Sequence, residues 1–163
     1  MTEPIWLTVA LSYRGIREIP GPKHHPKILE WWRLIKRAGI KDDETPWCAA
    51  FVGGCLEEVG LRSSRFESAR SYLSWGIPLR EPVPGCVVVF ERAGGGHVGF
   101  ATARAADGRL MILGGNQSNQ VSIAPFEAHR VIKGGYRWPE AVPVPTEPLP
   151  VVATAQSSSR NEA

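Results

Sequence analysis

TPWCAAF, at residues 45–51, is the stretch around which the rest of this sequence is organised. We interpret it as the start of a helix, because Thr45 offers the side-chain oxygen of an N-cap and Pro46 fits the first helical position. Cys48 then falls in the first turn, among unpaired backbone N–H groups at the positive end of the helix dipole. Such a position stabilises a thiolate and lowers the thiol pKa. Cys48 is therefore a candidate nucleophile, although most free cysteines are small buried hydrophobic residues.

This helix is predicted to run from Pro46 to about Val59, because its apolar residues recur at helical spacing. Cys55 lies deep on the same apolar stripe, so we expect it to pack in the core. Two helices are predicted before it, over residues 4–13 and from Pro26 to a stop at Gly39, and a short one after it, over residues 68–75.

Strand patterns follow the helical part, starting after residues 84–85. The predicted strands cover residues 86–90, 98–104, 109–113, 121–124 and 131–136, with a glycine loop at 94–96 and a hairpin turn at 106–108. Helices followed by an antiparallel sheet predict an α+β fold.

The last part of the sequence changes in composition again. Five prolines between residues 139 and 150 are followed by a serine run at 157–159. Such a segment is too polar and too rich in proline to form a core of its own. We therefore predict one domain over residues 1–138 and a flexible tail over residues 139–163.

Charge and composition are those of an ordinary soluble globular protein, with 163 residues, 43% hydrophobic residues, 21% charged residues and a net charge of +3. The positive charge is uneven, since residues 14–41 hold eight Lys or Arg against two Glu. A basic face suits an anionic polymer such as nucleic acid or cell wall, whereas the simpler interpretation is a solvated helix surface.

The three cysteines, Cys48, Cys55 and Cys86, are an odd number without a CxxC pair, which excludes a disulfide framework and a structural zinc site. The N-terminus lacks the basic region of a signal peptide, and the apolar run at residues 5–11 is too short to span a bilayer. We expect a chain made in the cytoplasm, which needs another route for any export.

His97 stands out among the four histidines, because it follows three glycines and opens a predicted strand. On that strand His97 shares a face with Gly99, Ala101 and Ala103, and a face of small residues lets a helix approach closely. Packing of the helix of Cys48 there brings the thiol against a base, as nucleophilic catalysis requires. The alternative is a histidine at a strand edge that bonds only to backbone.

The residue that orients His97 is expected from the end of the next strand, where GGNQSN occupies residues 114–119. Asn116 is placed to accept a hydrogen bond from the imidazole and fix its tautomer. Gln117 and Asn119 are alternatives for the same role. Asn116 is equally able to serve only as a turn residue after two glycines.

Three motifs, TPWCAAF, GHVGF at 96–100 and GGNQSN, occur in the order found in the CHAP and NlpC/P60 cysteine peptidases, which this sequence resembles. The likeness is greatest to a group of small endolysin-like proteins of bacteriophages and prophages. Four further segments resemble that group, at residues 18–21, 42–44, 69–73 and 135–137. The resemblance covers roughly residues 10–138.

The resemblance implies a papain-like α+β fold that hydrolyses an amide bond in peptidoglycan. It assigns the nucleophile to Cys48, the general base to His97 and the third polar residue to Asn116. Trp47 and Gln117, which adjoin these residues, are candidates for contact with the substrate, although a Trp beside a helix start is equally able to serve only in packing.

The sequence departs from the family pattern at two places. Many CHAP domains carry Glu two residues before the Asn, where this sequence has Gly114, and no Gln precedes Cys48 to supply an oxyanion donor as in papain. The oxyanion hole is then expected to use the backbone N–H of Cys48 and a second donor, for which Tyr13 is a candidate.

Some CHAP domains hold calcium just before the cysteine. The acidic residues Asp42, Asp43 and Glu44 occupy that place here, but they lack the alternating ligand spacing of a calcium loop. We expect no metal and no cofactor.

These observations lead to one principal hypothesis, a phage or prophage lysin that acts as a monomer on bacterial peptidoglycan and binds neither nucleic acid nor membrane. It is expected to be an endopeptidase or an N-acetylmuramoyl-L-alanine amidase, and to reach the wall by holin release or from a virion. Two alternatives remain: a catalytically silent wall-binding or virion module, and a thiol acyltransferase on the same fold.

Overall fold

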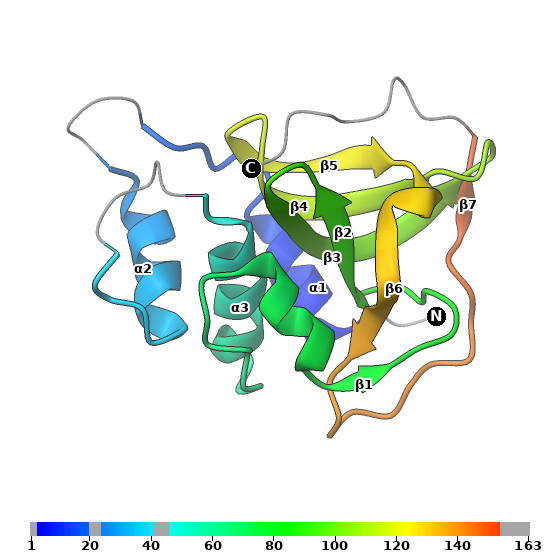
Figure 1. The fold of residues 1–163 in the computed structure, drawn as a ribbon, viewed down its shortest axis with the longest axis horizontal. Helices are drawn as coiled ribbons and strands as arrows, with labels where there is room; N and C mark the ends of the chain where they lie inside the picture. Colours follow the sequence, from blue (N-terminus) through cyan, green and yellow to red (C-terminus); the bar gives the residue numbers. More distant parts are fainter. Residues whose placement is uncertain (1–2, 20–23, 41–45, 154–163) are drawn as a thin grey trace.

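The computed structural model describes residues 3–19, 24–40 and 46–153, and it has the predicted α+β fold (Figure 1). Its helical part comes first along the chain. The helices are α1 (Ile5–Ser12), α2 (Pro26–Leu34), α3 (Cys48–Glu58) and the 3-10 helix η1 (Ala69–Ser74), and a second 3-10 turn, η2 (Ala128–Arg130), lies between two strands.

One sheet follows the helices, with its main strands in the order β1-β6-β2-β3-β4-β5 and all neighbours antiparallel. The five predicted strands correspond to β2 to β6, while β1 and β7 have only two residues each and were not predicted. The bounds are β1 Ile77–Pro78, β2 Val87–Arg92, β3 Gly95–Ala105, β4 Leu110–Gln117, β5 Gln120–Phe126, β6 Val131–Trp138 and β7 Val151–Val152.

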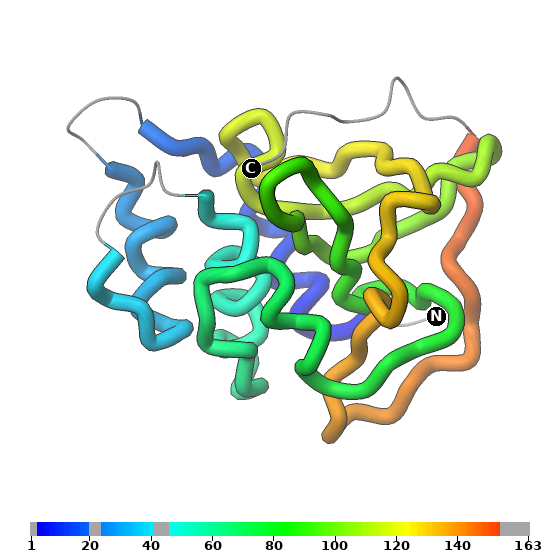
Figure 2. The backbone as a smooth tube through the Cα atoms, in the orientation of Figure 1, coloured from blue at the N-terminus to red at the C-terminus, as the bar shows by residue number. Residues whose placement is uncertain are grey.

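The core joins two helices and the sheet through aromatic side chains. α3 lies between α2 and the sheet, as the tube in Figure 2 shows. Trp31 of α2 packs edge-on against Phe51 of α3, with ring centroids 5.2 Å apart, and Phe51 packs in the same way against Phe100 of β3 at 6.0 Å. All three rings are buried, so this stack fixes α3 against β3.

Two glycines allow the close approaches that this packing needs. A Cβ atom at Gly54 of α3 would lie 2.7 Å from Cγ of Trp31, and one at Gly115 of β4 would lie 2.6 Å from Cβ of Phe51. Both distances are too short for carbon atoms in contact. α2 and β4 therefore reach α3 only because these positions have no side chain.

The backbone pairing between β3 and β4 ends before the first residues of β3. Paired residues of the two strands run from Arg104 and Leu110 to Phe100 and Leu113. Beyond that point residues 95–99 of β3 pair with β2, whereas Gly114 pairs with β5. The first residue of α3 can thus contact one edge of β3.

The predicted packing of a helix on the small-residue face of β3 is wrong. Phe100, on the opposite face, contacts Phe51 of α3. The face of His97 instead carries stacked rings, with Phe126 of β5 4.7 Å from Phe90 of β2 and 5.3 Å from His97. Strands β2 and β5 are not neighbours in the sheet, so the sheet curls around these rings.

Some predicted element ends also need correction. α3 begins at Cys48, two residues after Pro46, and its N-cap is Trp47. The predicted cap Thr45 lies outside the described residues. α2 ends at Leu34 rather than near Gly39, because Lys36 adopts a φ of +65°, which is incompatible with a continuing α-helix.

The predicted flexible tail does not begin at Pro139. Residues 139–153 run along the domain, where Leu149 is buried and the Trp138 indole donates a hydrogen bond to the Val142 carbonyl at 2.8 Å. β7 pairs with the end of β3 in parallel. The predicted tail residues 154–163 lie outside the described part of the chain.

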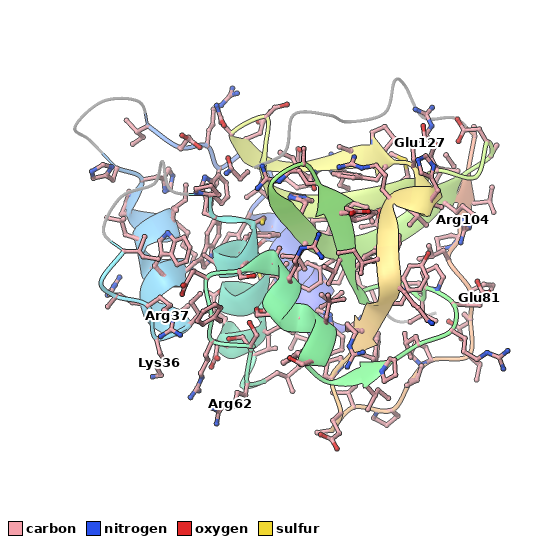
Figure 3. All side chains as sticks on the ribbon, in the orientation of Figure 1. Lys36, Arg37, Arg62, Glu81, Arg104 and Glu127 are labelled. Carbon is pink, nitrogen blue, oxygen red and sulfur yellow. The ribbon has the colours of Figure 1, made fainter. Side chains whose placement is uncertain are left out.

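The basic segment predicted from residues 14–41 is partly neutralised by ion pairs. Lys27 contacts Glu58 of α3 at 2.8 Å, and Arg37 contacts Glu67 at 2.9 Å. Lys36, Arg37 and Arg62 gather at one end of the helical layer, while Arg104 and Glu127 lie on the far side of the sheet (Figure 3). No helix in the described ranges is long and apolar enough to cross a bilayer.

The contact at Gly54 makes a testable prediction about stability. We expect Gly54→Ala to lower the free energy of unfolding by about 1–3 kcal/mol, because the added methyl group overlaps the Trp31 ring and outweighs the better helix propensity of alanine. Gly39→Ala is the matched control, since a Cβ there meets nothing within 4 Å. Urea unfolding of both variants measures the difference, and equal midpoints would contradict the packing described here.

Candidate active site

Cys48 is the first residue of α3, and 4% of its surface is exposed. The first turn of α3 contains no acidic residue, and the N-cap Trp47 makes no side-chain hydrogen bond to it. Backbone N–H groups of a first turn lack partners within the helix and carry the positive end of its dipole. The sulfur therefore occupies the position where a helix best stabilises a negative charge.

His97 of β3 is fully buried and contacts the sulfur of Cys48 through a side-chain hydrogen bond. The backbone of Val98 makes a second hydrogen bond to the same sulfur. Both groups lie on the stretch of β3 beyond its last pair with β4. The predicted pairing of Cys48 with His97 is thus present.

The environment of Cys48 sets its thiol apart from the other two cysteines. Burial would raise its pKa, but the hydrogen bond and charge of His97, the backbone of Val98 and the charge of Arg92 together lower it below the ordinary value. Burial raises the pKa of Cys86 to about 12 and that of Cys55 well above the usual range. Only Cys48 among the three combines a lowered pKa with a neighbouring base.

Gln117, at the end of β4, is the residue that contacts the far side of the imidazole. Its Oε1 lies 3.0 Å from Nε2 of His97. Because an amide oxygen only accepts hydrogen bonds, Nε2 carries the proton, and Nδ1 is the ring nitrogen left for the thiol. This is the arrangement that a base needs in order to take up the thiol proton.

The orientation of the Gln117 amide is itself fixed by backbone. Its Nε2 donates to the carbonyls of Ser122 at 2.9 Å and Ile112 at 3.2 Å. Two carbonyl acceptors require the NH₂ group on that side, so the oxygen must face His97. The side chain is 1% exposed, which keeps water from competing for these bonds.

Gly114 provides the space that Gln117 occupies. A Cβ atom at Gly114 would collide with Oε1 of Gln117 and would lie 2.8 Å from its Cδ and 3.2 Å from Nε2 of His97. A side chain at position 114 and the present position of the Gln117 amide are therefore mutually exclusive. Gly114, where the sequence departs from the family pattern, is therefore the position that leaves room for Gln117 to contact His97.

Asn116 does not occupy the place that the resemblance assigned to it. It is 2% exposed, and its Oδ1 has no hydrogen-bond partner among the described residues. Its φ of +60° and a register shift between Gly114 and Gln117 interrupt the regular alternation of β4. The contact to His97 consequently comes from Gln117, one of the alternatives, and Asn119 uses its carbonyl to accept a bond from the Glu18 backbone.

Trp47 and Tyr13 also lie elsewhere than predicted. Trp47 is fully buried, stacks on Trp31 and donates its indole N–H to Glu18 at 3.1 Å, so it offers no surface to a substrate. The hydroxyl of Tyr13 donates to Glu58 at 2.7 Å. Glu58 ends α3, about 15 Å along the helix from Cys48, which is too far for an oxyanion donor.

A metal site finds no support in the part of the chain that the structure describes. No group of three or more His, Cys, Asp or Glu side chains there is arranged to hold an ion. The acidic residues Asp42, Asp43 and Glu44 lie outside the described ranges, so the hypothesis about them stays a prediction.

Comparison with known families now adds to this geometry. The family model of the CHAP domain matches residues 40–116. Over this segment the chain is similar to CHAP domains. The match confirms the predicted resemblance to the CHAP family and is consistent with the papain-like α+β fold of the structure. A search among curated proteins found no match.

CHAP domains are typically cysteine-type amidases or endopeptidases that act on peptidoglycan. The match spans Cys48, His97 and Asn116 and ends one residue before Gln117. The residue that contacts His97 here thus lies just outside the segment that matches the family.

The position of Gln117 makes a prediction that separates it from Asn116. Gln117→Leu keeps the volume but removes the bond to Nε2, so we expect the rate constant for amide hydrolysis to fall by about 10- to 1,000-fold with little change in KM. Asn116→Gly removes the side-chain amide of Asn116, and glycine readily adopts the positive φ of this position. We therefore expect this variant to retain most of the activity. Steady-state kinetics on wall fragments measures both, and the reverse order of losses would restore Asn116 as the third residue.

Proposed function

We propose that this protein hydrolyses an amide bond of the peptidoglycan stem peptide through the thiolate of Cys48. The observation that supports this most strongly is the continuous chain from the Cys48 sulfur through the His97 ring to the Gln117 amide. A nucleophile, a base and a group that orients the base are the three components of thiol catalysis. The CHAP match adds peptidoglycan as the class of substrate.

The proposed reaction has two steps. The Cys48 thiolate attacks the amide carbonyl carbon while His97 holds the thiol proton at Nδ1, and collapse of the intermediate breaks the C–N bond as that proton passes to the leaving amine. A thioester remains on Cys48. Water then attacks the thioester, His97 takes a proton from the water, and the products are a carboxylate and the restored thiol.

The start of α3 gives the nucleophile a second role in this proposal. The carbonyl oxygen becomes negative in each tetrahedral intermediate, and the backbone N–H of Cys48 lies at the positive end of the helix dipole. One helix terminus therefore stabilises both the thiolate before attack and the oxyanion after it. The N-terminal position of Cys48, rather than its burial alone, makes this possible.

We further propose that the protein acts as a monomeric phage or prophage lysin, made in the host cytoplasm and delivered to the wall by holin release or from a virion. The proposal rests on the likeness to small endolysin-like proteins over residues 10–138. Endopeptidase and N-acetylmuramoyl-L-alanine amidase cleavage use the same thiol chemistry, and mass spectrometry of digested peptidoglycan distinguishes their products.

Purified wall tests the proposed hydrolysis directly. We expect the parent protein to reduce wall turbidity and release new amino groups, and Cys48→Ala and His97→Gln to lower the initial rate at least 100-fold, because each removes a reacting group. Cys55→Ala is the matched control on the same helix, and its activity should stay within a few-fold of the parent. Circular dichroism establishes that each variant is folded.

Other results would contradict the proposal in distinct ways. Lysis by Cys48→Ala at the parental rate would exclude the thiol mechanism. Wall binding by the parent without release of amino groups would indicate a catalytically silent module. A product mass that includes an acceptor other than water would indicate an acyltransferase.

A further inference from the structure

A cavity of about 730 Å³ lies beside the hairpin that joins β2 to β3. The charged side chains in its wall are Arg70 from η1, Arg130 from η2, and Arg92 and Glu91 from the end of β2. Residues 93–95 supply backbone to the same wall. Three guanidinium groups against one carboxylate make this cavity electropositive.

The cavity adjoins the catalytic centre. Gly95 in its wall precedes His97 by two residues on β3, and the charge of Arg92 contributes to the lowered pKa of the Cys48 thiol. Arg70 of η1 packs against the same stretch of β3, because a Cβ atom at Gly96 would lie 3.2 Å from Cγ of Arg70. Two residues along a strand span about 7 Å, so one peptide substrate can reach both the cavity and the reacting pair.

Two of the guanidinium groups are held in place without being neutralised. Arg70 donates from Nε and Nη2 to the carbonyl of Gly95, at 3.3 and 2.9 Å, and Arg92 donates from Nε to the carbonyl of Gly96 at 3.3 Å. Neither forms an ion pair with a carboxylate among the described residues. Carbonyl contacts orient a guanidinium and leave its charge and its other N–H donors for a ligand.

We propose that Arg70 and Arg92 form a subsite that binds a carboxylate of the peptide substrate next to the bond that is cut. The inference rests on the proposed function, which makes the bound molecule a wall peptide. Guanidinium groups bind carboxylates through paired charge-assisted hydrogen bonds, and an amide in place of the carboxylate carries no charge to pair with them. The protein then distinguishes peptides with a free carboxylate from peptides in which that carboxylate is amidated.

The subsite has a kinetic signature. A carboxylate held away from the reacting carbonyl is bound equally in the ground state and the transition state, so its loss raises KM and leaves kcat nearly unchanged. We expect a synthetic stem peptide with free carboxylates to have a KM about 10-fold lower than the same peptide with amidated carboxylates. Arg70 is the better residue to change, because Arg92 also acts on the thiol.

The experiment compares both peptides with the parent protein and three variants. Arg70→Gln can still donate a hydrogen bond to the Gly95 carbonyl but has no charge, and it should abolish the preference for the free carboxylate. Arg70→Lys should keep part of the preference. Arg80→Ala removes an exposed positive charge outside the cavity and should behave as the parent. The rate of Cys48 alkylation should be the same in all four proteins.

Equal KM values for the two peptides with the parent, or an unchanged preference in Arg70→Gln, would overturn the subsite while the hydrolysis itself stands. Failure of the parent to cleave either peptide would instead overturn the proposed function. Binding of the two peptides to the Cys48→Ala variant, measured by calorimetry, then decides the subsite independently of catalysis. Tighter binding of the free-carboxylate peptide supports it, and equal binding refutes it.

Discussion

The packing of α3 against the sheet is the constraint on which the rest of this structure depends, because it brings Cys48 to His97. The hydrogen bond between Cys48 and His97 joins the first residue of α3 to a buried position on the part of β3 that lies beyond its last pair with β4. The stack of Trp31, Phe51 and Phe100 holds α3 against the sheet, and Gly54 and Gly115 permit the approach. The hydrophobic core therefore sets the geometry of the thiol and the imidazole, which is how a rigid scaffold prepares a reactive pair.

The neutral amide of Gln117 gives this site a particular character. Many CHAP domains have a glutamate where this chain has Gly114, and a carboxylate beside the ring stabilises an imidazolium by its charge. Gln117 instead fixes the tautomer and the ring orientation through one hydrogen bond. Glutamate at position 117 would not be equivalent, because it would place an oxygen against the carbonyls of Ile112 and Ser122. A side chain at position 114 and the amide of Gln117 in its present place therefore exclude one another.

Local sequence patterns were sufficient for the order of elements, for strands β2 to β6 and for the candidates Cys48 and His97, because each depends on neighbours in the chain. The sequence patterns gave wrong predictions where contacts between segments far apart in the chain determine the structure. Strict alternation along β3 put the helix on the wrong face, since curling brings Phe126 onto the His97 side. The sequence indicates Asn116 rather than Gln117 as the partner of His97, because the register shift in β4 has no signal in the sequence apart from Gly114. Burial of Trp47 and pairing of β7 likewise depend on contacts between segments remote in sequence.

The pH dependence of cysteine alkylation tests the central claim, that the start of α3 and His97 together make Cys48 a thiolate. Iodoacetamide labelling followed by peptide mass spectrometry reports each of the three cysteines separately. Cys48 should react first, and its rate should reach half of its maximum at a pH below the pKa of an ordinary thiol. His97→Gln should move this midpoint to higher pH, because the imidazole that lowers the pKa of Cys48 by its hydrogen bond and charge is lost. A Cys48 profile that coincides with those of Cys55 and Cys86, or that does not respond to the loss of His97, would contradict the account.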